Sequence, residues 1–159
     1  MQLTETIGDV VLIANEGTSI AQCISSDIAM GAGIAKAIEA AFHIRGDILG
    51  RCTPDMLTVG NVVEIRREVC PGRIISIFNV ITKPKAHDKP TYETLRLGLE
   101  RLGELLSEYS RVYGTRRIPE LAIPRLGCGL DGLQWDVVRP MVQKTLCGNG
   151  THVCVYVLK

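Results

Sequence analysis

Segments with the patterns of strands and helices alternate along this chain, and this alternation constrains its fold more than any other feature. Short runs of β-branched and aliphatic residues are typical of strands. The clearest helix has leucines at helical spacing, after Pro90 and a capping Thr91. We predict strands at 2–7, 20–24, 61–66, 74–79, 120–124 and 152–158, helices at 31–42, 91–109 and 136–147, and either a strand or a buried turn at 10–14.

The connections between these segments indicate how they pair. Pro71-Gly72 is a turn signal between two predicted strands and predicts a β-hairpin. Because proline is tolerated only in the first turn of a helix, Pro140 places the start of the last helix at about 136–138. Hydrophobic residues make up 46% of the chain, enough to cover a sheet on both faces. We therefore predict an α/β fold, a three-layer α/β/α structure around a central mixed sheet, with residues 1–159 as a single domain.

The charge balance and the N-terminal residues limit the class of protein. The formal net charge is +1, so no general basic field favours nucleic acid as the main partner, although a local patch remains open. The N-terminal residues lack the basic segment of a signal peptide, and no apolar run approaches the roughly 20 residues of a membrane span. We expect a soluble, intracellular monomer that does not act at a membrane, in the cytoplasm and with a nuclear location left open.

The residues that most often bind metals show no recognisable ligand spacing. No two cysteines have the C-x-x-C spacing, and His43, His87 and His152 are spread along the chain, so we expect no metal and no cofactor. We interpret the cysteines as mostly buried, reduced thiols, with disulfides as the alternative. Cys128, between two glycines, is interpreted as a packing residue rather than a nucleophile. The cysteines are Cys23, Cys52, Cys70, Cys128, Cys147 and Cys154.

Three segments that follow predicted strands carry residues suited to ligand binding. The first is Ser25–Ile34 (SSDIAMGAGI), in which Gly31-Ala32-Gly33 opens an alanine-rich helix. Glycines let backbone amides approach a ligand, and the N-terminus of a helix attracts anions such as a diphosphate. The alternative is a loop that only packs a helix tightly, because short Gly-x-Gly patterns are common.

The second segment is Pro124–Asp131 (PRLGCGLD), whose Gly127 and Gly129 follow one predicted strand and precede the last predicted helix. Such a loop can surround a phosphate and a ribose with backbone N–H groups. Arg125 is either a solvated structural side chain or a phosphate ligand. Asp131 is either a helix cap or a catalytic group.

The third segment is Ile81–Tyr92 (ITKPKAHDKPTY), in which a buried strand runs into a cationic, proline-rich stretch. Lys83, Lys85 and Lys89 lie close together in this run. Such a group of lysines usually indicates a solvated loop or a site that attracts phosphate. A partly desolvated lysine near other cations could instead lose its proton and act as a nucleophile. Pro84 favours an extended backbone at the preceding residue, but composition alone does not choose among the three lysines.

Taken together, these segments resemble the macrodomain family. The sequence is most similar to the branch that contains the terminal ADP-ribose protein glycohydrolase, also called O-acyl-ADP-ribose deacylase. The resemblance rests on QCISSDIAMGAGIA at 22–35, ITKPKAHDKPTYETL at 81–95, PRLGCGLDGLQW at 124–135 and YVL at 156–158, in matching order and spacing.

The resemblance implies a role for particular residues. In that branch a lysine attacks the anomeric carbon of the distal ribose, displaces a linked carboxylate and forms a lysyl–ADP-ribose adduct; here it matches Lys83. An aspartate that acts as the acid–base group matches Asp131. Asp9 would accept from the adenine amino group, while Val10 and Leu158 would offer apolar faces to the ring. The implied ADP-ribose contacts are Asp9, Val10, Ser25, Gly31, Ala32, Gly33, Ile34, Arg125, Leu126, Gly127, Cys128, Gly129, Leu130 and Leu158.

Departures from the family pattern leave alternatives open. Gln22 replaces an expected histidine, Pro84 an expected basic residue, and Ala86-His87-Asp88 a small-Ser-His arrangement, all of which bear on the distal ribose and the rim of the site. We expect a hydrolase that removes ADP-ribose from glutamate or aspartate on proteins, or from O-acyl-ADP-ribose. The alternatives are a non-catalytic ADP-ribose reader, a hydrolase of ADP-ribosylated DNA bases, and an ADP-ribose 1″-phosphate phosphatase.

Overall fold

A six-stranded sheet forms the centre of the computed structural model, which describes residues 3–113, 118–148 and 150–158. The strand order is β1-β6-β5-β2-β4-β3, and every neighbouring pair is parallel except the antiparallel hairpin of β3 and β4. The predicted mixed sheet and the predicted hairpin at Pro71-Gly72 are therefore confirmed. The strands are β1 (Leu3–Ile7), β2 (Ser19–Ser25), β3 (Val62–Cys70), β4 (Arg73–Lys83), β5 (Glu120–Ile123) and β6 (His152–Val157).

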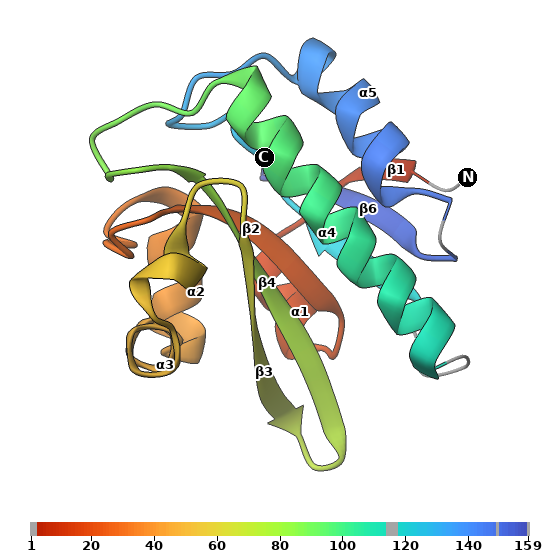
Figure 1. Ribbon diagram of the computed structural model, residues 1–159. Helices are drawn as coiled ribbons and strands as arrows, with labels where there is room; N and C mark the ends of the chain where they lie inside the picture. Colours follow the sequence, from red (N-terminus) through yellow and green to blue (C-terminus); the bar gives the residue numbers. More distant parts are fainter. Residues whose placement is uncertain (1–2, 114–117, 149, 159) are drawn as a thin grey trace.

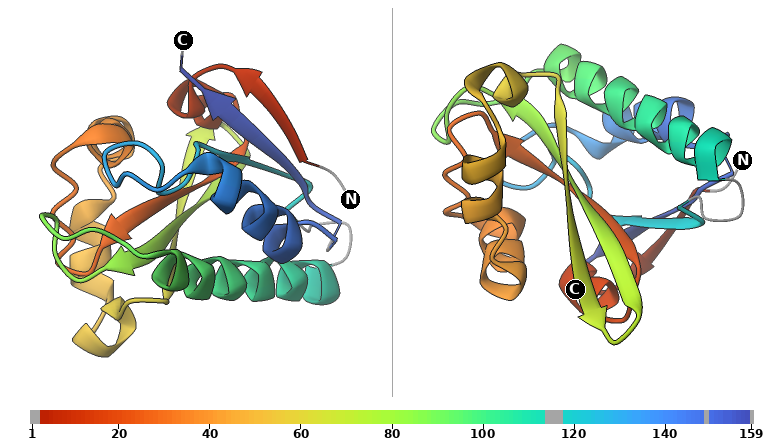
Figure 2. Two further views of the ribbon diagram at one scale, coloured as in Figure 1. Left: turned by 90° about the horizontal axis from the view of Figure 1, so that it is seen from above. Right: turned by 60° about the horizontal axis from the view of Figure 1, so that its bottom comes forward.

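Helices cover both faces of this sheet (Figures 1 and 2). On one face α4 and α5 lie side by side, and Leu95, Leu99 and Val142 on these helices pack against Phe78 and Val153 of the strands. The opposite face is covered by α1, α2 and α3, so the three-layer α/β/α prediction is correct. The helices are α1 (Val10–Asn15), α2 (Gly33–Phe42), α3 (Arg45–Arg51), the short 3₁₀ helix η1 (Pro54–Leu57), α4 (Tyr92–Tyr113) and α5 (Trp135–Leu146).

Segment 10–14, expected as a strand or a buried turn, is instead the helix α1. The Asp9 side chain accepts a hydrogen bond from the Val11 amide at 2.9 Å, which caps the helix. The Asp9 carbonyl accepts from the Ile13 amide at 3.1 Å and closes the first turn. A short apolar run is compatible with a strand or with a helix. Here the hydrogen bond to the Asp9 side chain stabilises the helix.

The last helix, α5, begins at Trp135, slightly before the predicted start at 136–138. The Gln134 carbonyl accepts from the Val137 and Val138 amides, which forms the first turn ahead of Pro140. Pro140 lies inside the helix and has no amide hydrogen, so it cannot donate to the Asp136 carbonyl four residues before it. Both residues are exposed. Water can satisfy this carbonyl, so the helix tolerates the proline.

The cysteines are thiols, as predicted, but most of them are not fully buried. Only Cys154 is buried, Cys70 is exposed, and the other four are half-buried. The exposed position follows from the hairpin, because Cys70 ends β3 beside the turn. No helix in the described part of the chain is both long and apolar enough to cross a membrane.

Candidate functional site

A cleft of about 940 Å³ opens at the carboxyl ends of the parallel strands. After β2 the chain enters α2 on one face of the sheet, and after the adjacent β5 it enters α5 on the opposite face. Neighbouring strands that lead to opposite faces leave a crevice between their loops, which is where open α/β sheets bind ligands. The three segments singled out by sequence therefore meet at one place.

The cleft contains every residue that the sequence analysis named as catalytic or ligand-binding. These residues are Asp9, Val10, Ser25, Gly31, Ala32, Gly33, Ile34, Lys83, Arg125, Leu126, Gly127, Cys128, Gly129, Leu130, Asp131 and Leu158. The cleft is also lined by Gly8, Cys23, Ile24, Met30, Ala35, Ala86, Lys89, Pro124, Leu133, Trp135, Tyr156 and Val157, which were not assigned to the site.

The first wall of the cleft is the loop between β2 and α2. Helix α2 begins at Gly33 without a side-chain cap, so its first amides face the cleft without a side-chain acceptor. Ile28 and Met30 both have a positive φ, near +50°, a conformation that costs non-glycine residues energy. The Arg45 guanidinium holds this backbone by donating to the Ile28 carbonyl at 2.6 Å.

Asp27 joins this loop to the one that follows β4. Its carboxylate accepts from the Ser25 hydroxyl at 2.5 Å and from the Ala86 amide at 3.1 Å. The Ser26 amide also donates to the Lys83 carbonyl at 2.9 Å. Burial by itself would raise the pKa of Asp27, but these hydrogen bonds lower it below its ordinary value. Asp27 is therefore an anion that positions both loops.

The second wall is the loop Pro124–Asp131. Gly127 has a φ of +74°, and the Leu133 amide donates to its carbonyl at 2.9 Å, so the loop turns back on itself there. The Arg125 guanidinium lies 3.4 Å from a Glu5 carboxylate oxygen and 5.8 Å from the centre of the Trp135 ring. These contacts favour the interpretation of Arg125 as a structural side chain over its interpretation as a phosphate ligand.

Lys83 and Asp131 meet across the cleft. The lysine is the last residue of β4, and its Nζ donates to Asp131 Oδ1 at 2.7 Å. The two side chains are 14% and 16% exposed, so this ion pair is largely shielded from water. The other two lysines differ: Lys89 donates from Nζ to the Leu130 carbonyl at 2.6 Å, while Lys85 is exposed and does not line the cleft.

Two thiols lie next to this ion pair. Burial raises the pKa of Cys23 to about 12, with the charge of Asp131 adding to the effect. Burial also raises the pKa of Cys128 to about 11. Both thiols are therefore protonated at neutral pH, and a protonated thiol is a poor nucleophile. This agrees with the interpretation of Cys128 as a packing residue.

Asp9, Val10 and Leu158 form the far end of the cleft. Val10 is only 3% exposed, whereas Leu158 is 70% exposed, so the leucine is the better candidate for an apolar face offered to a ligand. Tyr156 lies beside Gly8, where an added Cβ would be 2.6 Å from its ring. The alternation of β6 could have suggested Tyr156, because residues two apart on a strand share a face.

Gln22, one of the departures from the family pattern, lies outside the cleft. Its side chain is fully buried and donates from Nε2 to Asn79 Oδ1 at 2.8 Å. Gln22 therefore does not line the cleft itself, and its effect on substrate preference stays a prediction. The residues of β2 that line the cleft are the last three of the strand, Cys23, Ile24 and Ser25, and Gln22 precedes them.

This architecture defines a class of protein, an α/β domain with a ligand cleft between two glycine-containing loops at the carboxyl edge of its sheet. No family model matches the sequence. The chain is 34% identical to the human ADP-ribose glycohydrolase OARD1 over 140 residues, which are 88% of this chain and 82% of that protein. The same identity and coverage are found for the bovine OARD1.

Solved structures agree with this relationship. The macrodomain of Thermus aquaticus DarG superposes with a TM-score of 0.78 at 25% identity, covering 98% of both chains. Thermosipho africanus DarTG, solved with ADP-ribose, superposes with a TM-score of 0.75 at 22% identity, over 98% of this chain and 41% of that one, a likeness of fold alone. The chain belongs to the macrodomain family, in the branch that contains the OARD1 glycohydrolases.

Proposed function

We propose that this protein is an ADP-ribosyl hydrolase that acts on esters of ADP-ribose through a covalent lysine intermediate. The substrates would be ADP-ribosylated glutamate or aspartate on proteins, or O-acyl-ADP-ribose. The observation that carries the proposal is the shielded contact of 2.7 Å between Lys83 Nζ and Asp131 Oδ1. The similarity to the OARD1 proteins, which are named ADP-ribose glycohydrolases, supports it.

The cleft has the parts that ADP-ribose needs. The uncapped amides at Gly33 and the loop around Gly127 can donate to the diphosphate, and Lys89 adds a cation at the same wall. Asp9 and Leu158 stand at the far end, where they can accept from the adenine amino group and cover the ring. With the nucleotide bound in this order, the distal ribose would lie beside Lys83.

The chemistry follows from the lysine and the aspartate. The Lys83 amine must be neutral to attack, and Asp131 is placed to take its proton. The amine forms a bond to the anomeric carbon, the bond from that carbon to the ester oxygen breaks, and the carboxylate leaves with the electron pair. Asp131 gives the proton that it took from Lys83 to the departing carboxylate. Water then attacks the same carbon and loses a proton to Asp131. The Lys83–carbon bond breaks with its electron pair going to nitrogen, and Asp131 returns this proton to the amine.

The geometry favours this lysine over the other two. Lys89 donates from Nζ to the Leu130 carbonyl, and Lys85 is exposed and does not line the cleft. Among the described residues, neither of these amines forms an ion pair with a carboxylate that could remove its proton. Asp131 does not cap α5, whose N-cap is Gln134. Its carboxylate would be positioned by the hydrogen bond from Lys83.

Covalent trapping tests the proposal directly. Incubation with ADP-ribose and cyanoborohydride should reduce the imine between the lysine amine and the ribose aldehyde, and peptide mass spectrometry should locate the adduct on Lys83. Lys83→Ala should abolish both the adduct and release of ADP-ribose from a glutamyl-linked peptide, while it still binds free ADP-ribose. Lys85→Ala is the matched control and should behave as the wild type. An adduct on Lys85 or Lys89 would refute the assignment.

The same assay separates the alternatives. A non-catalytic reader would bind ADP-ribose but release none from the peptide, and the wild type would equal Lys83→Ala. Parallel reactions with an ADP-ribosylated oligonucleotide and with ADP-ribose 1″-phosphate identify the other two activities. We expect the glutamyl ester and O-acyl-ADP-ribose to react fastest, because a carboxylate is a good leaving group that needs no metal.

A further inference from the structure

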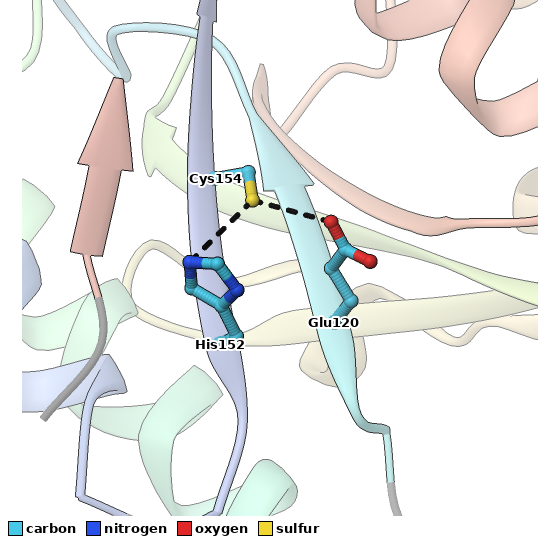
Figure 3. Close-up of side chains that lie close together, drawn as sticks. All are labelled: Glu120, His152 and Cys154. Atoms are coloured by element: carbon cyan, nitrogen blue, oxygen red, sulfur yellow. Dashed lines mark hydrogen bonds between the residues drawn. The ribbon is translucent and has the colours of Figure 1, made fainter. Parts of the chain in front are cut away.

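Three side chains of different chemistry converge on the sheet outside the lining of the cleft. Figure 3 shows Glu120 on β5 and His152 and Cys154 on β6 pointing toward one another. Glu120 and His152 are paired in register on adjacent strands, and Cys154 lies two residues further along, on the same face as His152. The possible ligand atoms all lie within 4.8 Å of one another.

The two distances that involve the Cys154 sulfur are close to those between the ligands of a tetrahedral metal ion. The Cys154 Sγ lies 3.2 Å from Glu120 Oε1 and 3.8 Å from His152 Nε2. A zinc ion with bonds of about 2.0–2.3 Å holds its ligand atoms about 3.3–3.8 Å apart. Sulfur, imidazole nitrogen and one carboxylate suit zinc and exclude magnesium and calcium, which prefer oxygen alone.

A catalytic triad is the competing interpretation, and the contacts argue against it. In a triad the carboxylate bonds to the ring nitrogen of the histidine that faces away from the nucleophile. Here Glu120 contacts the Cys154 sulfur instead, and the same His152 Nε2 faces both Cys154 and the Thr4 hydroxyl. Cys154 is also only 6% exposed, which leaves little room for a substrate.

We propose that Glu120, His152 and Cys154 bind one zinc ion, with water as the fourth ligand. Binding displaces the thiol proton to solvent, so the thiolate and the carboxylate balance the charge of the ion. The Thr4 hydroxyl, 3.2 Å from His152 Nε2 and 3.4 Å from Cys154 Sγ, is placed to bond to the water. The ion joins β5 and β6 beside β1.

The zinc ion would stabilise the sheet, and the lining of the ADP-ribose cleft includes none of its three ligands. The two sites are neighbours, because the side chain of Tyr156, which lines the cleft, interacts with Glu120 and Cys154. The sequence did not indicate this site, because its histidine and cysteine are separated by one residue and Glu120 lies on another strand.

Metal titration of the whole chain tests this proposal. Calorimetry with Zn²⁺ should give one ion per chain and a higher melting temperature, and Co²⁺ should give a thiolate-to-cobalt absorption band. Cys154→Ser should remove the band and weaken Zn²⁺ binding by at least about tenfold. Cys70→Ser, which changes an exposed thiol outside the site, should alter neither.

The variants also show how the proposal fails. Circular dichroism reports whether Cys154→Ser is folded; if it is not, Glu120→Gln carries the test, since it removes a ligand and keeps the side-chain shape. No stoichiometric Zn²⁺ binding by the wild type would overturn the proposal. So would unchanged affinity in Glu120→Gln, or loss of the cobalt band in Cys70→Ser.

Discussion

Two glycines of the PRLGCGLD loop should respond very differently to the same substitution. Gly127 has a φ of +74°, and an added Cβ would lie 3.0 Å from Leu133 Cδ1 and 3.4 Å from Leu95 Cδ2. Gly129 has no positive φ, and an added Cβ would meet nothing within 4 Å. Both line the cleft, so Gly129→Ala is a matched control for Gly127→Ala.

The cost of Gly127→Ala can be added up from its surroundings. The left-handed backbone disfavours an alanine by about 1 kcal/mol. Displacing the packed Leu133 and Leu95 side chains costs about 1–2 kcal/mol more. Unfolding entropy is roughly 2.1 cal/mol/K per residue, or ~0.33 kcal/mol/K for 159 residues. A loss of about 2–3 kcal/mol therefore lowers the melting temperature by about 6–9 °C.

Gly129→Ala should leave stability unchanged, or raise it by up to about 1 kcal/mol by restricting the unfolded chain. If the loop approaches ADP-ribose as proposed, its new methyl group should still weaken binding several-fold. Thermal unfolding and calorimetry with ADP-ribose measure the two effects separately. A Gly127→Ala variant as stable as Gly129→Ala would refute the conformational argument, and unchanged affinity in Gly129→Ala would refute the close approach of the ligand.

Two further predictions concern the lysines and the thiols beside the cleft. Lys89→Ala should weaken ADP-ribose binding several-fold, because it removes a cation and the bond to the Leu130 carbonyl, whereas Lys85→Ala should not; equal effects would contradict this. Burial holds the pKa of Cys23 at about 12 and that of Cys128 at about 11, while thiols of an unfolded chain ionise near 8.5. The unfolded state then loses protons that the native state keeps, so the contribution of these thiols to stability should be constant below about pH 8 and be lost as the pH rises toward 11. Urea unfolding between about pH 8 and 11 measures this change in the free energy of unfolding. A free energy of unfolding that rose with pH would contradict the prediction.

Local patterns in the sequence determined most of the secondary structure. The leucines of α4 recur at the spacing of one helical face, and the turn at Pro71-Gly72 requires the hairpin of β3 and β4. Such features depend on neighbours within a few residues, so they can be predicted without the fold. The Asp9 cap accounts for α1, whereas the sequence predicted neither α3 nor η1, both of which begin without a side-chain cap.

The sequence also placed the candidate site at three loops. Composition alone left three lysines and two meanings of Asp131 open, and the family resemblance selected Lys83 and a catalytic Asp131. Only the tertiary structure brings Lys83 and Asp131, 48 residues apart, to 2.7 Å. It does so because β4, β2 and β5 are parallel neighbours, which puts their carboxyl ends side by side. The pairing of strands likewise joins Glu120 to Cys154. Strand order and register arise from the packing of the whole core, which no local spacing encodes.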